Sequence, residues 1–480
     1  MVIEPRFYSP RPALWPALAW VWALAWGAVA GLILFTVPFD ASETPGNLLR
    51  YLSRPSALDV FLGTFSGEAW PQPGFLRTVS DATGQLVFDL APDGVFTAFR
   101  TLHLGMLVAL QVLLVRVARV DSPLMLGVVI VAGTALFGLH TFHESVRETE
   151  LNIKLLVPVL CLGALALSAG RHHWWHDVAA VLLTFYAAFS NELGLLVWVC
   201  VAAAWLVGLR GVSRTGVLLS TALVVAYFLL RFVFWDIGSP SLIERSSGFG
   251  LRVLDPPELI ARFGDAPLVL YVHNVAAAAL TVLFTEPRSG AWVLVRQALE
   301  DTVSGARVLE LAISLLTTGL MGWFVIRRWH DWRRRAFTYH DGLFLTGLAV
   351  IAGNAAISYP YLKEVTMSTG GVFYAVAMLA PLRLLLESLA QRVSLQRAVV
   401  TLIVVAALAA GWTLRGLSFV MDLTRTGIQY AAEWDSVIRA SDFTPAELEY
   451  LAGIGDEMRA YHRPLIAEEP RWLERLDPEH

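Results

Sequence analysis

The sequence predicts an all-α polytopic membrane protein. Of its 480 residues, 56% are hydrophobic and 16% are charged, whereas a soluble protein averages roughly 25% charged residues. The mean hydropathy is +0.59. About eleven apolar stretches come close to the ~20 residues that a helix needs to cross a bilayer. The 17 tryptophans fit a chain that meets many membrane interfaces.

Charge and cysteine content argue against a nucleic-acid-binding protein and against a disulfide-stabilised one. The net charge is −4 and the basic residues lie in clusters, so nucleic acid is not expected as a partner. The two cysteines, Cys161 and Cys200, both lie inside apolar runs. Packing is the expected role for them, and a disulfide framework is not.

The first apolar stretch, Ala13–Pro38, follows Arg6 and Arg11. It is too long for a signal-peptide core, so we expect a retained span with a cytoplasmic amino end. Residues 39–98 then form a long, acidic, Pro- and Gly-containing loop that we place outside the cytoplasm. Within it, LDVFLGTF and GQLVFDL are expected to form short interfacial helices. A loop of this length between two spans is usually functional.

Several spans follow this loop in close succession, at about 99–118, 123–140, 152–169 and 215–233. Between the last two, Val178–Ser190 and Leu193–Leu209 predict a tight hairpin whose turn holds Glu192. The tract RHHWWHD at Arg171–Asp177 is compatible with metal binding, but its arginine and tryptophans favour an interfacial belt.

A second long loop, residues 234–307, contains the ambiguous stretch Pro267–Phe284. Arg327–Arg335, RRWHDWRRR, is the strongest cytoplasmic signal in the chain. If Pro267–Phe284 crossed the membrane, this cluster would be placed outside. The positive-inside rule therefore favours an interfacial or re-entrant helix there.

The last spans are expected at about 308–326, 342–359, 370–386 and 398–414, with the carboxyl end outside. Residues 1–415 would form the transmembrane domain and 416–480 a short helical tail. In that tail, Thr444, Pro445 and Glu447 have the spacing of a capped helix start.

A polar segment, LHTFHESVRETE at Leu139–Glu150, interrupts apolar sequence at the end of one span. On a helix, His140, His143 and Glu144 would share one face. Ionisable groups at a membrane boundary are costly to desolvate, so the cluster suggests a site. An interfacial cap whose polar groups merely meet water and headgroups would have the same spacing.

Three segments in order resemble motifs of the GT-C superfamily, especially the tetratricopeptide-containing transmembrane O-mannosyltransferases (family 39-like). They are LFGLHTFHESV at Leu136–Val146, AAFSNELGLLV at Ala187–Val197 and AYFLLR at Ala226–Arg231. The chain departs from the family pattern: Thr141 replaces a proline, Asn191 replaces a lysine, and no tetratricopeptide array follows.

The resemblance implies a GT-C-like membrane glycosyltransferase of a bacterial inner membrane. Such enzymes transfer a hexosyl or mannosyl group from a polyprenyl-phosphate carrier to an extracytoplasmic protein or glycan acceptor. It places the catalytic acid just beyond the first span, at Asp40 with Glu43 as the fallback. Asp40 could equally be a solvated loop acid.

The remaining candidates follow from the same resemblance. His143 and Glu144 would line the catalytic cavity, with His140 and Glu192 beside them. Lys154, Arg231 and Arg245 are the candidates for the donor phosphate. Lys154 could instead pair with Glu150 on the same helix face.

No cofactor is required in this interpretation. A divalent metal on His140, His143 and Glu144 is conceivable, but the spacing differs from the HExxH zinc motif. A transporter or flippase is the competing class, and the asymmetric outer loops without an inverted repeat weigh against it. A GT-C-shaped scaffold without catalysis is the third alternative.

Overall fold

The structure is a computed structural model that describes residues 14–34, 39, 44–54, 56–66, 77–139, 153–235, 243, 245–248, 252–284, 291–300, 305–362, 364–390, 395–440 and 443–466. Across these residues the chain is helical, and it contains no strand, only two isolated bridges. Seven of the described helices are long and apolar enough to cross a membrane. The predicted fold class, an all-α polytopic membrane protein, is therefore confirmed.

The helices that form the bundle are α1 (Leu14–Leu34), α5 (Val95–Ala118), α6 (Pro123–Phe137), α7 (Ile153–Ser168), α8 (Trp174–Ala188), α9 (Leu195–Leu206), α10 (Arg214–Leu229), α14 (Gly305–Arg333), α15 (Tyr339–Ile357), α16 (Ser368–Ala390) and the first half of α17 (Leu395–Ala440). Of these, α6, α7 and α9 are apolar but shorter than a full span. The most extensive helix pairings are α15 with α16 and α1 with α5.

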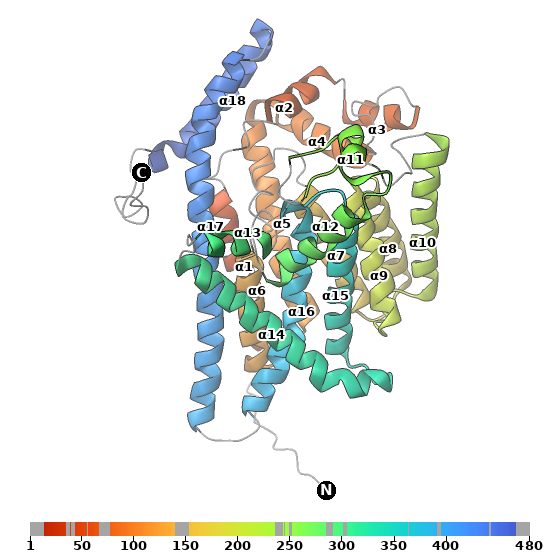
Figure 1. Ribbon diagram of the computed structural model, residues 1–480, viewed down its shortest axis with the longest axis vertical. Helices are drawn as coiled ribbons and strands as arrows, with labels where there is room; N and C mark the ends of the chain where they lie inside the picture. Colours follow the sequence, from red (N-terminus) through yellow and green to blue (C-terminus); the bar gives the residue numbers. More distant parts are fainter. Residues whose placement is uncertain are drawn as a thin grey trace.

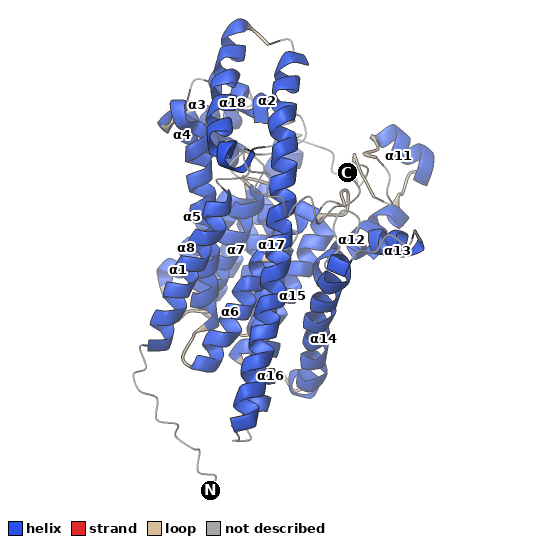
Figure 2. Ribbon diagram, turned by 90° about the vertical axis from the view of Figure 1, so that its left-hand side faces the viewer, coloured by secondary structure: helices blue, strands red, loops and turns tan. Residues whose placement is uncertain are grey.

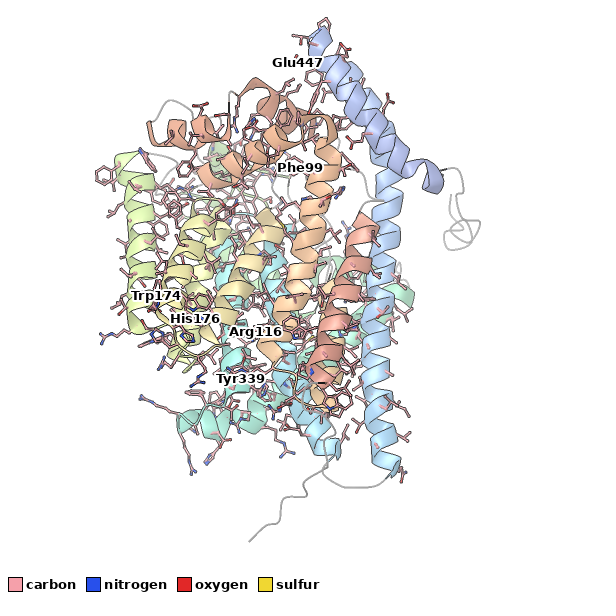
Figure 3. All side chains as sticks on the ribbon, turned by 180° about the vertical axis from the view of Figure 1, so that it is seen from behind. Phe99, Arg116, Trp174, His176, Tyr339 and Glu447 are labelled. Carbon is pink, nitrogen blue, oxygen red and sulfur yellow. The ribbon has the colours of Figure 1, made fainter. Side chains whose placement is uncertain are left out.

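The bundle has two distinct ends. Phe99 lies toward the upper end in Figure 3, and Arg116, Trp174, His176 and Tyr339 lie at the lower end. Helices α8, α10 and α15 therefore rise from the lower end, and α5 and α7 descend to it.

Polar side chains tie the loops of the lower end together. The rings of His172 and His176 have Nδ1 atoms 3.3 and 3.1 Å from the Gly211 carbonyl oxygen. The Asp177 carboxylate accepts hydrogen bonds of 2.7 Å from the backbone and hydroxyl of Ser213, which caps α10. Trp174 is 75% exposed, as an interfacial belt requires. The RHHWWHD tract thus holds the loop that enters α10.

Three short helices cover the upper end: α2 (Thr44–Ser53), α3 (Ala57–Ser66) and α4 (Thr78–Leu90) (Figure 1). The predicted helices in the first long loop are confirmed by α3 and α4. A small aromatic core joins this cover to the bundle and to the carboxyl-terminal helices, and its members include Phe39, Tyr51, Phe88, Phe99, Trp434 and Leu451.

The second long loop carries α11 (Pro256–Phe263), α12 (Leu268–Leu283) and α13 (Ala291–Leu299). Helices α11 and α12 meet at an angle of 103°. Figure 2 shows the three helices projecting to one side of the bundle, above the middle of its height. The buried Asn274 side chain donates to the carbonyl oxygens of Ser247 and Tyr359 at 2.9 and 2.8 Å, which fixes α12 to the upper loops.

The carboxyl-terminal region differs from the expected short tail. The boundary expected after Arg415 lies inside α17, a continuous helix of 46 residues. At 1.5 Å per residue such a helix is roughly 70 Å long, more than twice the ~30 Å hydrocarbon core. Helix α18 (Pro445–Ile466) follows it above the bundle (Figure 1). Its predicted cap is confirmed, since the Glu447 amide donates to the Thr444 hydroxyl at 3.4 Å and the Thr444 amide donates to the Glu447 carboxylate at 2.7 Å.

Candidate functional site

Glu192 lies in a tight turn between two antiparallel helices at the upper end. Helix α8 ends at Ala188, a short 3-10 turn covers Glu192–Gly194, and α9 begins at once. The Asn191 side chain accepts a hydrogen bond of 2.9 Å from the Leu193 amide. A Cβ at Gly194 would lie 1.8 Å from the Ala187 carbonyl oxygen, so only glycine fits this close turn. The predicted hairpin with Glu192 in its turn is confirmed.

Arg231 is the ion-pair partner of Glu192. It lies in a π-helical turn, Leu230–Phe234, that follows α10, and such turns recur at functional sites. Its Nη1 atom is 2.9 Å from Glu192 Oε1 and donates to the Tyr227 hydroxyl, also at 2.9 Å. The Arg231 side chain is 9% exposed and that of Glu192 is 26% exposed. The pair is thus largely withdrawn from water and still reachable from the carboxylate side.

The carboxylate retains hydrogen-bonding capacity. The two Glu192 oxygens have about four lone-pair sites, and Arg231 Nη1, 2.9 Å from Oε1, occupies one of them. Buried carboxylate oxygens normally accept hydrogen bonds, because an unmet acceptor costs free energy. Glu192 can therefore accept a proton donor such as a hydroxyl group without giving up an existing hydrogen bond.

Helix α4 of the first long loop is fastened over this hairpin. The Val79 amide donates to the Phe189 carbonyl oxygen at 3.0 Å, and the Ser80 hydroxyl donates to the Ser190 carbonyl oxygen at 3.0 Å. The hydroxyls of Thr83 and Tyr186 are 2.9 Å apart. The first loop and the Glu192 turn thus form one packed unit.

A second polar group lies in the upper part of α5. Arg100 and His103 are buried, one helical turn apart, and neither was among the residues expected at the site. The Arg100 guanidinium is 4.0 Å from the centre of the Phe39 ring, and the His103 and Phe39 rings are 6.4 Å apart. Phe39, which directly precedes Asp40 in the sequence, contacts both of these basic side chains. The signal in the sequence was a pair of basic residues inside an apolar span.

The candidates Asp40, Glu43, His140, His143 and Glu144, with Glu150, lie outside the described residues. Leu139, which precedes His140, is buried at the end of α6, and Lys154 lies in the first turn of α7.

The end of α6 packs against α17 near a third buried cation. A Cβ at Gly138 would lie 2.5 Å from the Trp412 carbonyl oxygen. Arg415, one turn further along α17, donates to the Ser314 hydroxyl at 2.8 Å and to the Glu310 carbonyl oxygen at 3.2 Å. Arg415 is 2% exposed, and the sequence analysis did not include it in the site.

Arg245 differs from Arg231 in its surroundings. It forms a 3.2 Å ion pair with Asp255, and both side chains are about two-thirds exposed, at 65% and 66%. Exposed pairs of this kind contribute little free energy. Of the two arginines, Arg231 has the environment of a binding residue.

Among the residues that the structure describes, no group of three or more His, Cys, Asp or Glu side chains is arranged to hold a metal ion. No family model, curated protein or solved structure matches the chain. The fold defines the class as an integral membrane protein built from apolar α-helices.

Proposed function

We propose that the protein is a membrane glycosyltransferase that moves a sugar from a polyprenyl-phosphate carrier to an extracytoplasmic protein or glycan acceptor. The observation that carries this proposal is the Glu192–Arg231 pair at the upper end. Both residues belong to motifs that resemble the GT-C superfamily. A buried cation beside a carboxylate with free acceptor capacity suits a phosphate leaving group and a hydroxyl-bearing substrate.

In the proposed reaction, Asp40 takes the proton from the acceptor hydroxyl. The acceptor oxygen then bonds to the anomeric carbon while the bond from that carbon to the phosphate oxygen breaks. Glu43 is the alternative base, and His143 and Glu144 position the sugar with His140 nearby. The carrier leaves as polyprenyl phosphate, whose charge Arg231 and Lys154 stabilise. The exposed Arg245 is the weaker phosphate candidate.

The proposed topology has about eleven crossings, namely the bundle helices α1, α5–α10 and α14–α17, with α12 as an interfacial or re-entrant helix. The amino end would be cytoplasmic and α18 extracytoplasmic, because Arg327–Arg335 lies at the lower end. Single cysteines at Arg334 and Glu449 test this in intact cells. A membrane-impermeant reagent should label only the Glu449 position, and the reverse pattern would overturn the topology.

The activity test uses purified protein in liposomes with a radiolabelled polyprenyl-phosphate hexose. Transfer of label to an added acceptor fraction, lost in Asp40→Asn and Arg231→Gln but not after chelation of metals, is the expected result. Binding of the carrier without transfer under every acceptor condition would favour the non-catalytic scaffold.

A transporter or flippase remains the second candidate. The same liposomes separate it from the enzyme, because a flippase moves the intact carrier across the bilayer and leaves the bond between sugar and phosphate unbroken. Recovery of intact carrier in the opposite leaflet, with no labelled acceptor, would replace the proposed enzyme.

A further inference from the structure

The lower end of α14 carries an unusual density of arginine. Residues 327–335 contain five arginines and one aspartate. Figure 1 shows α14 slanting across the bundle, with its lower end reaching out beneath α15. The helix ends close to Arg335, whose φ of 57° is left-handed and turns the chain back toward α15.

One arginine of this cluster is structural. Arg328 donates to Asp341 at 2.9 and 2.7 Å, and Asp331 supplies a second carboxylate. The Trp332 ring packs on the same side of α14, and its centre is 5.9 Å from the centre of the Phe344 ring. This inward face holds the end of the helix in a fixed orientation against α15.

The other four arginines point away from that face. Arg327, Arg333, Arg334 and Arg335 are all exposed, and none has an acidic partner among the described residues. Next to them, Ile326 is 77% exposed and Trp329 is 56% exposed. Unpaired cations interleaved with exposed apolar and indole side chains are the composition of a surface that binds the interface of an anionic membrane.

We propose that this surface, formed by Ile326, Arg327, Trp329 and Arg333–Arg335, binds the headgroups of anionic phospholipids in the surrounding bilayer. Ile326 and Trp329 enter the boundary of the acyl region, and the guanidinium groups pair with lipid phosphates, which they can contact in a bidentate manner. The Arg328–Asp341 pair holds the surface at the depth of the headgroups. This inference is independent of the proposed glycosyl transfer.

Native mass spectrometry of the detergent-purified full chain tests the proposal. The protein is titrated with phosphatidylglycerol or with phosphatidylcholine of the same acyl chains. The wild-type protein should bind phosphatidylglycerol more tightly. The triple variant R333Q/R334Q/R335Q should lose about 100-fold in affinity for it, since each charge contributes about fivefold at low salt.

The control neutralises three exposed arginines in the second long loop, R252Q/R262Q/R296Q, and should bind phosphatidylglycerol as the wild type does. A second variant, R333K/R334K/R335K, keeps the charge and should retain most of the binding, which separates charge from a folding defect. The proposal is overturned if the glutamine triple variant binds like the wild type or if the control loses as much. Displacement of the lipid by millimolar inorganic phosphate would also overturn it, in favour of a soluble anion.

Discussion

Arg231 Nη1 lies 2.9 Å from Glu192 Oε1, and this contact joins the turn between α8 and α9 to the π-helical turn after α10, at the end where the first long loop covers them. The residues are 39 positions apart in the sequence, and each is the only charged residue in its apolar stretch. Burying one charge alone among apolar residues costs free energy. The opposite charge of the partner residue offsets part of that cost.

The first prediction is energetic coupling between these two residues. Glu192→Gln and Arg231→Gln should each destabilise the protein by about 1–3 kcal/mol, because each removes the charge that stabilises its partner. The double variant should lose less than the sum, which thermal unfolding in detergent can measure. The exposed pair Arg245 and Asp255 is the control and should show almost no coupling. Additive losses at Glu192 and Arg231 would refute the coupling.

The second prediction concerns the proposed base. Asp40→Asn should reduce transfer by ~100-fold or more, because a positioned general base contributes at least that factor. Carrier binding and thermal stability should stay near wild-type values. Asp59→Asn is the matched control in the same loop, since the Asp59 carboxylate is held by the nearby Ser56 hydroxyl at 2.5 Å. Equal activity of the two variants would remove Asp40 from the site.

The third prediction addresses the buried carboxylate at the lower end. Asp341 is fully buried and accepts hydrogen bonds from Arg328 and from the Thr338 amide and hydroxyl. Asp341→Asn should therefore cost about 3–5 kcal/mol in unfolding free energy. Glu387→Gln, which breaks the more exposed ion pair with Arg383, should cost less than about 1 kcal/mol. Similar losses of unfolding free energy in both variants would contradict the prediction that a buried ion pair contributes more than an exposed one.

The fourth prediction concerns the attachment of α18. Trp434 is 1% exposed and donates to the Leu451 carbonyl oxygen at 3.3 Å, and Thr97 of α5 donates to Glu457 at 2.9 Å. Trp434→Ala should lower the free energy that holds α18 in place by about 3–5 kcal/mol. In limited proteolysis, α18 should then be cleaved before the helices of the bundle. Trp174→Ala, at an exposed position, should leave the cleavage pattern unchanged.

The fifth prediction is a pH dependence at the start of α18. Hydrogen bonds from the backbone amide and the hydroxyl of Thr444 hold the pKa of Glu447 below its usual value of 4.5. Because the folded pKa is the lower one, this stabilisation is present above pH 4.5 and is lost as the pH falls through the folded pKa. Hydrogen exchange of the amides in the first turn of α18, corrected for intrinsic rates, should accelerate as the pH falls through this range. Thr444→Ala removes the hydroxyl but keeps the backbone amide, so it should show part of this acceleration already at neutral pH.

The sequence by itself determined the class of the protein and much of its element order. Long apolar runs leave the backbone no alternative to helices in a membrane, so composition alone indicates the all-α fold. The Glu192 turn and the cap at Thr444 were also predictable, because turn and cap chemistry depends on neighbouring residues.

The tertiary structure decided which distant residues meet. The residues next to Arg231 in the sequence do not indicate that it pairs with Glu192. Those next to Arg100 do not indicate that its guanidinium lies over the Phe39 ring. Both contacts depend on how the helices pack. Packing likewise places Arg415 inside the bundle, where the Ser314 hydroxyl and the Glu310 carbonyl oxygen accept its hydrogen bonds. Helix propensity is local, whereas the free energy that retains a buried charge comes from partners far away in the chain.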